Sequence, residues 1–213
     1  MSKSIAVIDY GMGNLRSVSK AIEHVAGAHD KIHVTDDPEL ILQADRVVFP
    51  GQGAARDCMA AISKHHLNRA VLKAAETKPF LGICMGMQVL MRFSEENQGT
   101  PLMGLFEGQV KHFPESRDAE GHRLKIPQMG WNRVKQTLDH PLWEGIDDDT
   151  RFYFVHSYYV DPEDRELVAG TTDYGIPFTS VIARDNLFAT QFHPEKSADA
   201  GLRLLQNFVN WDI

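Results

Sequence analysis

Four short apolar segments, each running into a glycine or a proline, set the strongest limit on the fold of this chain. They are SIAVIDYG, RVVFPG and PFLGIC in the first half and LFATQFHP near the end. Short apolar runs rich in Ile, Val and Phe are typical of strands buried on both faces of a parallel sheet. Each segment is therefore predicted to be a strand that ends at a loop.

Stretches with helical spacing separate the first three segments. Leu15, Val18, Ile22 and Val25 recur on one face of NLRSVSKAIEHVA, and AARDCMAAISKHHLNRAVLKAAE has a similar period. The order strand, helix, strand, helix predicts an α/β fold with a doubly wound, mostly parallel central sheet flanked by helices. SADAGLRLLQNFVNWDI opens with serine and aspartate and repeats leucine at helical intervals, which predicts a closing helix.

The second half has shorter segments separated by turn signals, among them GQVKHF, TRFYFVHSYYV and FTSVIARDN. This spacing predicts an added antiparallel sheet, layered onto the parallel one. Because the sequence has no internal repeat, low-complexity segment or obvious linker, we expect residues 1–213 to form a single domain.

Charge and hydropathy narrow the classes of partner and location. The formal net charge is −7 and no basic run occurs, so neither nucleic acid nor an anionic membrane is expected as the main partner. No apolar stretch approaches the ~18 residues of a membrane span, and the first one is too short for a secretion signal, which predicts a cytoplasmic location. Cys58 and Cys84 form no CxxC pair, so neither a metal nor a cofactor is expected.

Cys84 lies in GICMGMQ, where a predicted strand meets a helical pattern. Gly-x-nucleophile-x-Gly is typical of a sharp strand-to-helix turn that exposes a nucleophile at the edge of a sheet. The first free N–H groups of the next helix, expected over MGMQVLMRF, favour a thiolate there. A cysteine in an apolar context is more often a small buried hydrophobe, and we keep that interpretation for Cys58. The two glycines favour a catalytic role for Cys84.

His193 is the best placed of the ten histidines to act as the base for this nucleophile. It follows the apolar strand LFATQF, and Glu195 lies two residues on, so both side chains point the same way in an extended chain. A carboxylate there can orient the imidazole and stabilise its charged form, which completes a triad of Cys84, His193 and Glu195. An ordinary ion pair at a strand end is the alternative.

Acyl transfer by such a triad also needs hydrogen-bond donors for the oxyanion. PGQG, residues 50–53, follows the strand RVVF, and its glycines allow a turn whose N–H groups point into a pocket. The backbone amides of Gln52 or Gly53, together with that of Met85, are predicted to form the oxyanion hole. By itself, PGQG is equally typical of a simple turn.

PGQG, GICMGMQ and HPEKS, in this order and at these separations, resemble the class I glutamine amidotransferases. IDYGMGNLRSV, PQMGWN and FVHSYY extend the resemblance over essentially the whole chain, to the glutaminase subunits of imidazole glycerol phosphate synthase in histidine biosynthesis. The resemblance implies that Cys84 attacks the side-chain amide of glutamine and that His193 protonates the leaving ammonia. Water would then hydrolyse the glutamyl thioester, with Glu195 orienting the base.

The resemblance also implies contacts with the substrate glutamine. Gln88, one turn after Cys84, can hydrogen-bond the substrate, and Glu96 can pair with its ammonium group. Gly51 and the backbone of Ser157 and Tyr158 are the further contacts implied. Alternatively, Gln88 could lie on a solvated helix face, Glu96 could be a solvated loop carboxylate, and Tyr158 could be a core or interface aromatic.

The glutaminase machinery accounts for all 213 residues, so the acceptor of the ammonia is expected on a separate protein. In the resembling family this partner is a (β/α)8-barrel cyclase subunit, which forms imidazole glycerol phosphate and an aminoimidazole carboxamide ribotide. The docking residues implied are Asn14, Trp131, Asn132 and Lys196, each of which could instead be a cap, a core aromatic or a surface charge. Glutaminase activity is expected to rise only when the partner holds its own substrate.

Gln52 departs from the pattern, because the family usually has an aliphatic residue at this position, in PGVG. Three other functions stay open: a cysteine peptidase or amidase on the same scaffold, an amidotransferase of another pathway, and a non-catalytic regulatory subunit. YGMGN and QMGWN favour histidine synthesis. The presence of all three triad residues counts against a non-catalytic role.

Overall fold

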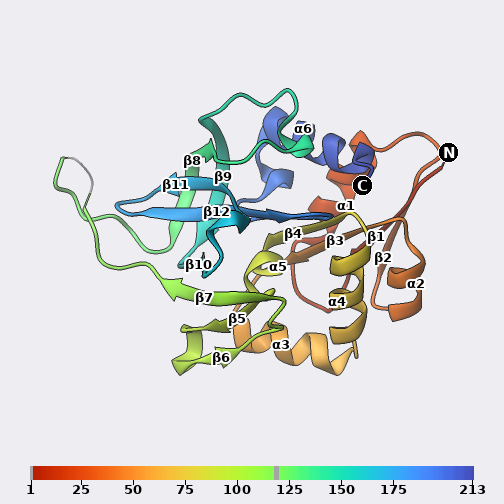
Figure 1. Cartoon of the computed structure of the whole chain (residues 1–213), viewed down its shortest axis with the longest axis horizontal. Coiled ribbons are helices and arrows are strands. Elements are labelled where there is room, and N and C mark those ends of the chain that lie inside the picture. The colour runs from red at the N-terminus through yellow and green to blue at the C-terminus, as the bar shows by residue number, and fades with distance from the viewer. Residues whose placement is uncertain (1, 118–119) are drawn as a thin grey trace.

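The computed structural model describes residues 2–117 and 120–213, and its centre is one continuous hydrogen-bonded sheet (Figure 1). Five neighbouring strands run parallel, in the spatial order β2 (Lys31–Thr35), β1 (Ser4–Ile8), β3 (Arg46–Gly51), β4 (Phe80–Cys84) and β13 (Leu187–Thr190). Four of them are the predicted apolar segments. The predicted fold class is confirmed.

Helices cover both faces of the parallel strands (Figure 1). One face carries α1 (Leu15–Val25) and α6 (Ala198–Asn210), and the other carries α2 (Pro38–Gln43), α3 (Ala55–Lys64) and α4 (Asn68–Thr77). Side chains alternate along β3, so Val47 and Phe49 join the apolar cluster under α3 and α4, while Val48 joins the one under α1 and α6. Burial on both faces explains why this strand reads as an unbroken apolar run.

The strands of the second half continue the same sheet. From β13 the order runs through β12 (Pro177–Arg184), β10 (Tyr158–Pro162), β7 (Phe106–His112), β5 (Met91–Ser94) and β6 (Thr100–Pro101). A branch leaves β12 through β11 (Val168–Asp173), β8 (Gln128–Gln136) and β9 (Thr150–His156). The expectation of a separate layered sheet is wrong in this detail, because backbone hydrogen bonds join the two parts edge to edge.

Several boundaries differ from the sequence prediction. The helical stretch after PGQG is two helices, broken near His66, whose φ of 57° leaves the helical region. The helix after Cys84, α5, covers only Met85–Gln88, because Met91–Ser94 pair with β7 instead. Four 3₁₀ turns complete the elements: η1 (Glu96–Gln98), η2 (Pro141–Trp143), η3 (Arg165–Leu167) and η4 (Pro194–Lys196). None of the helices in the described ranges is long and apolar enough to cross a membrane.

The parallel register brings three chain segments to one edge of the sheet. Gly51 at the end of β3 pairs with Cys84 at the end of β4, and Ile83 pairs with Thr190 at the end of β13. Because parallel strands end at the same edge, PGQG, the cysteine turn and HPEKS leave the sheet side by side.

Candidate active site

Cys84 lies at a sharp turn between β4 and α5. Its φ of 55° and ψ of −109° fall outside the ordinary regions for a residue with a side chain, which costs about 1–3 kcal/mol. Both flanking glycines are required by close approach. A Cβ added to Gly82 would lie 2.9 Å from the Cβ of Ala189, and one added to Gly86 would overlap the carbonyl oxygen of Phe49. The Gly-x-Cys-x-Gly pattern therefore predicts this turn for a packing reason.

The shortness of α5 changes the electrostatic argument for Cys84. A helix of four residues adds little to a macrodipole, so the expected effect of a long helix on the thiol does not apply. What remains is the amide of Met85, which stands at the first helical position and has no acceptor within the helix. The N–H of Met85 is the donor that directly follows Cys84 in the chain.

His193 follows β13 and is buried. Its Nδ1 lies 2.9 Å from Oε1 of Glu195, whose side chain is fully buried, so Nδ1 carries the proton and Nε2 is left for the thiol. Among the described residues Nε2 has no hydrogen-bond partner. Burial by itself lowers the pKa of His193, but the negative charges of Cys84 and Glu195 outweigh it and raise that pKa above its usual value.

Ser197 holds the turn that carries His193. Its Oγ donates to the carbonyl of His193 at 2.7 Å and accepts from the backbone N–H of Tyr153 at 2.9 Å. The N–H of His193 donates to the carbonyl of Tyr153 at 2.9 Å. The sequence suggested Ser197 as a helix cap, but its side chain makes no cap hydrogen bond. It instead fastens the HPEKS turn to β9.

The PGQG turn lies beside Cys84. Gly53 has a φ of 99°, a conformation that favours glycine. The carbonyl of Gln52 accepts from Sγ of Cys58 at 3.4 Å, and because C=O and N–H point in opposite directions, the N–H of Gly53 turns away from Cys58. Gly51 is buried inside β3 against Tyr10 and Met85 and does not line the cavity described next.

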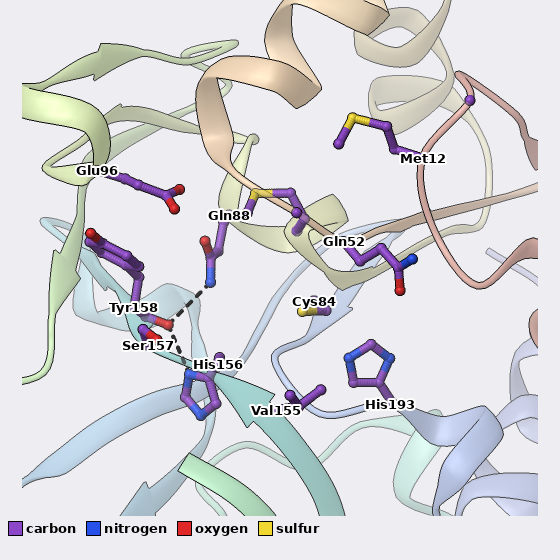
Figure 2. A pocket seen from close by; sticks show the side chains of 13 residues that line it. Met12, Gln52, Cys84, Gln88, Glu96, Val155, His156, Ser157, Tyr158 and His193 are labelled. Carbon is purple, nitrogen blue, oxygen red and sulfur yellow. Dashed lines mark hydrogen bonds between the residues drawn. The ribbon is translucent and has the colours of Figure 1, made fainter. Parts of the chain in front are cut away.

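A cavity of about 540 Å³ opens in front of the thiol. Figure 2 shows Gln88 and Glu96 on one side of Cys84, and Gln52 and His193 on the other. The sequence-predicted residues that line it are Gln52, Gly53, Cys84, Met85, Gln88, Glu96, Ser157, Tyr158 and His193. Sequence reasoning missed four lining residues, Gly11, Met12, Val155 and His156. The described residues hold no group of three or more His, Cys, Asp or Glu that fits a metal ion.

Acceptor atoms gather at the Gln88 side of the cavity. Nε2 of Gln88 donates to the carbonyl of Tyr158 at 3.1 Å, which leaves its Oε1 buried and without a partner in the described part of the chain. Glu96 reaches the same region and accepts from the N–H of Ala55 at 2.7 Å. A carboxylate and an unpaired amide oxygen suit a cationic donor such as an ammonium group.

His156 lines the cavity near Gln88 and helps to hold the backbone of Tyr158. Its Nδ1 donates to the carbonyl of Tyr158 at 2.8 Å, and its Nε2 lies 2.8 Å from the side-chain amide of Gln128. Burial lowers the pKa of His156 to about 4, so the ring is neutral at physiological pH. The motif FVHSYY gave no signal for this role, because a histidine in a strand looks like any core position.

The candidate docking residues fall into three places. Trp131 on β8 is 51% exposed and meets the ring of Tyr153 edge-on at 6.1 Å, while Lys196 lies 5.9 Å above the same ring. Asn132 donates to the carbonyl of Asp173 at 2.7 Å. Asn14 precedes α1 without a side-chain cap bond. The structure thus joins Trp131 and Lys196 in one surface cluster, whereas the Asn132 side chain binds the Asp173 carbonyl and Asn14 stands at the start of α1.

The sequence of this chain is similar to those of known proteins over nearly its full length. Residues 6–211 match the family model described as glutamine amidotransferase class-I. The chain is 54% identical over 211 residues to the imidazole glycerol phosphate synthase subunit HisH of Hydrogenovibrio crunogenus, covering 99% of this chain and 97% of the relative. It is 58% identical to the HisH subunit of Thiobacillus denitrificans, covering 100% and 93%.

Solved structures show the same fold at much lower identity. PurLQS from Thermotoga maritima superposes with a TM-score of 0.71 at 19% identity, covering 99% of both chains. The glutaminase domain of CTPS from Trypanosoma brucei gives 0.63 at 17%, covering 100% of this chain and 96% of the other. At such low sequence identities the similarity supports only a shared fold.

Proposed function

The chain belongs to the class I glutamine amidotransferase family, and we propose that it is the glutaminase subunit of an imidazole glycerol phosphate synthase. The observation that carries this proposal is the meeting of Cys84, the His193–Glu195 pair and PGQG at one cavity, where three parallel strands end. Relatives that are 54–58% identical over nearly the full chain and are named as HisH subunits of that synthase support the assignment to this branch.

Glutamine binding follows from the polar atoms of the cavity. The α-ammonium of glutamine donates to the Glu96 carboxylate and to Oε1 of Gln88, the buried acceptor left without a partner in the described chain. Its α-carboxylate meets the backbone of Ser157 and Tyr158. In this pose the side-chain amide reaches toward Cys84 and the PGQG turn.

Amide cleavage uses the triad in two half-reactions. Sγ of Cys84 attacks the amide carbon, and the oxyanion accepts from the N–H of Met85 and from an N–H of Gln52 or Gly53. Nε2 of His193 takes the thiol proton of Cys84 in this attack and then gives it to the departing nitrogen, which leaves as ammonia, and a glutamyl thioester remains. His193 then takes a proton from water as the water attacks the thioester, and glutamate and the free thiol are released.

The ammonia needs an acceptor, which we place on a (β/α)8-barrel cyclase subunit in a heterodimer with this single-domain chain. The Trp131–Lys196 cluster is the proposed docking point, with Asn14 and Asn132 as further contacts. Glutaminase activity is expected to be low in the isolated chain, because an uncoupled glutaminase would consume glutamine without product.

The test is ammonia release from glutamine by the purified chain, first by itself and then with the cyclase partner and its nucleotide ligand. Cys84→Ala is the blank. Strong stimulation that the variant lacks would support both the triad and the partner. Fast release by the isolated chain would refute the dependence on a partner, and no release in any mixture would refute the glutaminase assignment.

A further inference from the structure

Gln191 is a fully buried polar residue for which the reaction described above provides no role. It follows β13, two residues before His193, and its backbone N–H donates to the carbonyl of Ser180 at 2.8 Å. Its side chain lies between the nucleophile and the substrate-facing glutamine. Nε2 is 3.6 Å from Sγ of Cys84, and Oε1 accepts from Nε2 of Gln88 at 3.0 Å.

The backbone carbonyl of Tyr158 fixes the direction of this hydrogen-bond chain. A carbonyl can only accept, so the end of the Gln88 amide that faces it must be the NH₂ group. The second proton of that NH₂ group goes to Gln191, which must therefore present its oxygen to Gln88. The NH₂ group of Gln191 is then left to face the sulfur of Cys84.

Each end of this series of hydrogen bonds has a chemical consequence. A sulfur that faces an N–H donor is held as an acceptor, and a thiolate is a far better acceptor than a thiol. At the other end, both protons of the Gln88 amide are used by protein acceptors. Oε1 of Gln88 is therefore kept as the free acceptor of the cavity, with no partner among the described residues.

We propose that Gln191 is a positioning residue that orients the Cys84 sulfur and the Gln88 amide together, so that nucleophile and substrate acceptor are set by one side chain. The substrate half of this inference rests on the proposed glutaminase function, while the sulfur half does not. Gln191 touches no substrate atom, and its effect on glutamine passes through Gln88.

The titratable groups around Cys84 come from five places in the fold, and Gln191→Met leaves all of them in place. His193 with Glu195 lies after β13, Tyr10 follows β1, Cys58 lies on α3, Glu96 on η1 and His156 at the end of β9. The Cys84 charge raises the pKa of each of His193, Tyr10 and Cys58, although burial is the largest cause for the last two. A change in Cys84 reactivity in a Gln191 variant is thus assigned to the lost amide.

Two variants separate the two ends of Gln191. Gln191→Met keeps the length of the side chain and removes both hydrogen bonds. Gln191→Glu keeps an oxygen for Gln88 and places an oxygen, in place of a donor, opposite the sulfur. Gln136→Met is the matched control, because Gln136 is a partly buried glutamine on β8 that donates to the carbonyl of Ile146 at 2.9 Å.

The first measurement is the pH profile of Cys84 alkylation by iodoacetamide, followed on the Cys84 peptide by mass spectrometry. We expect Gln191→Met to move its midpoint upward by about one pH unit, and Gln191→Glu to move it at least as far. The second is KM for glutamine in the complex with the cyclase subunit. We expect about a ten-fold rise in Gln191→Met and less than about three-fold in Gln191→Glu.

An alkylation profile of either folded variant that superimposes on that of the parent would overturn the proposal. Equal KM increases in the Met and Glu variants would overturn its substrate half, because the retained oxygen would then have no effect on Gln88. If the parent complex releases no ammonia, the proposed function fails, but the alkylation profiles still decide whether Gln191 sets the sulfur. Gln136→Met should match the parent in both measurements.

Discussion

The charge of Cys84 and the carboxylate of Glu195 together raise the pKa of His193, so the ring keeps its proton to higher pH than a free imidazole. The side chains of His193 and Glu195 are both buried, and the carboxylate lies 2.9 Å from Nδ1 of the ring. The folded-state pKa of His193 is raised, so the stabilisation from this pair is complete below the unfolded pKa of about 6.5 and is lost as pH rises through the raised value. Ammonia departure needs the protonated ring, so the same pH window applies to activity.

The first prediction is that Glu195→Gln lowers the pKa of His193 and moves the alkaline limb of the glutaminase pH profile to lower pH. We also expect kcat to fall about a hundred-fold, because the ring loses its orienting carboxylate. Activity against pH in the complex checks this, with the exposed Glu76→Gln as control. An unmoved alkaline limb would show that the carboxylate does not set the charge of His193.

Cys58 and Cys84 are both buried cysteines, yet they should differ sharply in reactivity. Cys58 lies in the apolar cluster under α3, and desolvation there raises its pKa to about 12. Almost no thiolate exists at such a site near pH 8, whereas Cys84 opens onto the cavity. We therefore expect iodoacetamide at pH 8 to label Cys84 alone in the native chain.

Peptide mass spectrometry after timed alkylation measures this difference, and labelling in 8 M urea supplies the control in which both cysteines react. Comparable native rates at the two cysteines would contradict the burial argument. Selective labelling would also show that the Cys84 readout used for the Gln191 variants is free of a second thiol.

The sequence predicted the triad residues, but it did not predict the roles of the side chains that surround them. Cys84 and His193 could be found because each follows an apolar strand, and parallel strands end at one edge whatever the details of packing. Gln191 and Ser197 stand in the same motif-rich segment, but the Gln191 side chain meets Cys84 and Gln88, on the turn that follows β4, and the Ser197 hydroxyl meets β9. Such pairings depend on side-chain direction across several strands, which local spacing does not contain.

The turn that carries Cys84 depends on a backbone contact between two elements. The Cα of Gly86 on α5 approaches the carbonyl of Phe49 on β3 so closely that a Cβ has no room. We expect Gly86→Ala to lower the free energy of unfolding by about 3 kcal/mol or more, because either the turn or β3 must shift. Cys84 alkylation should slow at the same time.

A matched control is Gly104→Ala, since Gly104 has a φ of 70° but open space around its Cα. Its cost should be about 1–2 kcal/mol from backbone conformation alone, with Cys84 alkylation unchanged. Urea unfolding at 25 °C gives both values. Equal losses in the two variants would contradict the close-approach argument, because Gly86 lies in a helix without a positive φ and, unlike Gly104, has no backbone strain to explain the loss.

The elements that sequence patterns missed are those with weak apolar signals. β2 lies at the edge of the sheet and exposes most of its residues, so it lacks the apolar run that marked its neighbours. α2 has six residues, only one of which is buried. The helix after Cys84 was predicted too long because Met91–Ser94 is apolar enough to suit either state, and pairing with β7 decides for the strand.

Arg46 ties the start of β3 to the C-terminal segment of the chain. It opens β3, is 4% exposed, and reaches the carbonyls of Phe208 and Trp211 and the carboxylate of Asp212 at the end of α6. We expect Arg46→Met to lower the free energy of unfolding by about 3 kcal/mol, because the carbonyl of Trp211 loses its charged donor and that of Phe208 keeps only the N–H of Trp211. Asp212→Asn should lower the free energy of unfolding far less than Arg46→Met does, since the Asp212 side chain is 85% exposed.

Chemical denaturation of the two variants separates these contributions. Similar losses in both would mean that the ion pair, and not the carbonyl contacts, fixes the C-terminal segment. Because α6 also packs against η4, which follows His193, the Arg46 variant should lose glutaminase activity at a lower temperature than the parent while keeping the parental rate at 25 °C.

The proposed docking face is tested best at Trp131, its large exposed aromatic side chain. Trp131 projects from β8 with half of its surface open, and it shares the ring of Tyr153 with Lys196, which comes from the HPEKS segment. A partner that covers Trp131 would thus press on the same turn that carries His193. We expect Trp131→Ala to weaken binding to the cyclase partner about ten- to hundred-fold, as truncation of a central aromatic does.

Leu138 is the control, an apolar side chain that lies just beyond the other end of β8 and is 40% exposed. Calorimetric titration with the cyclase partner should give Leu138→Ala the parental affinity, and both variants should alkylate Cys84 at the parental rate. If Leu138→Ala weakens binding as much as Trp131→Ala, the docking face is not centred on Tyr153. If only Trp131→Ala does so, the proposed partner docks beside Tyr153, next to the HPEKS segment that contains His193 and Lys196.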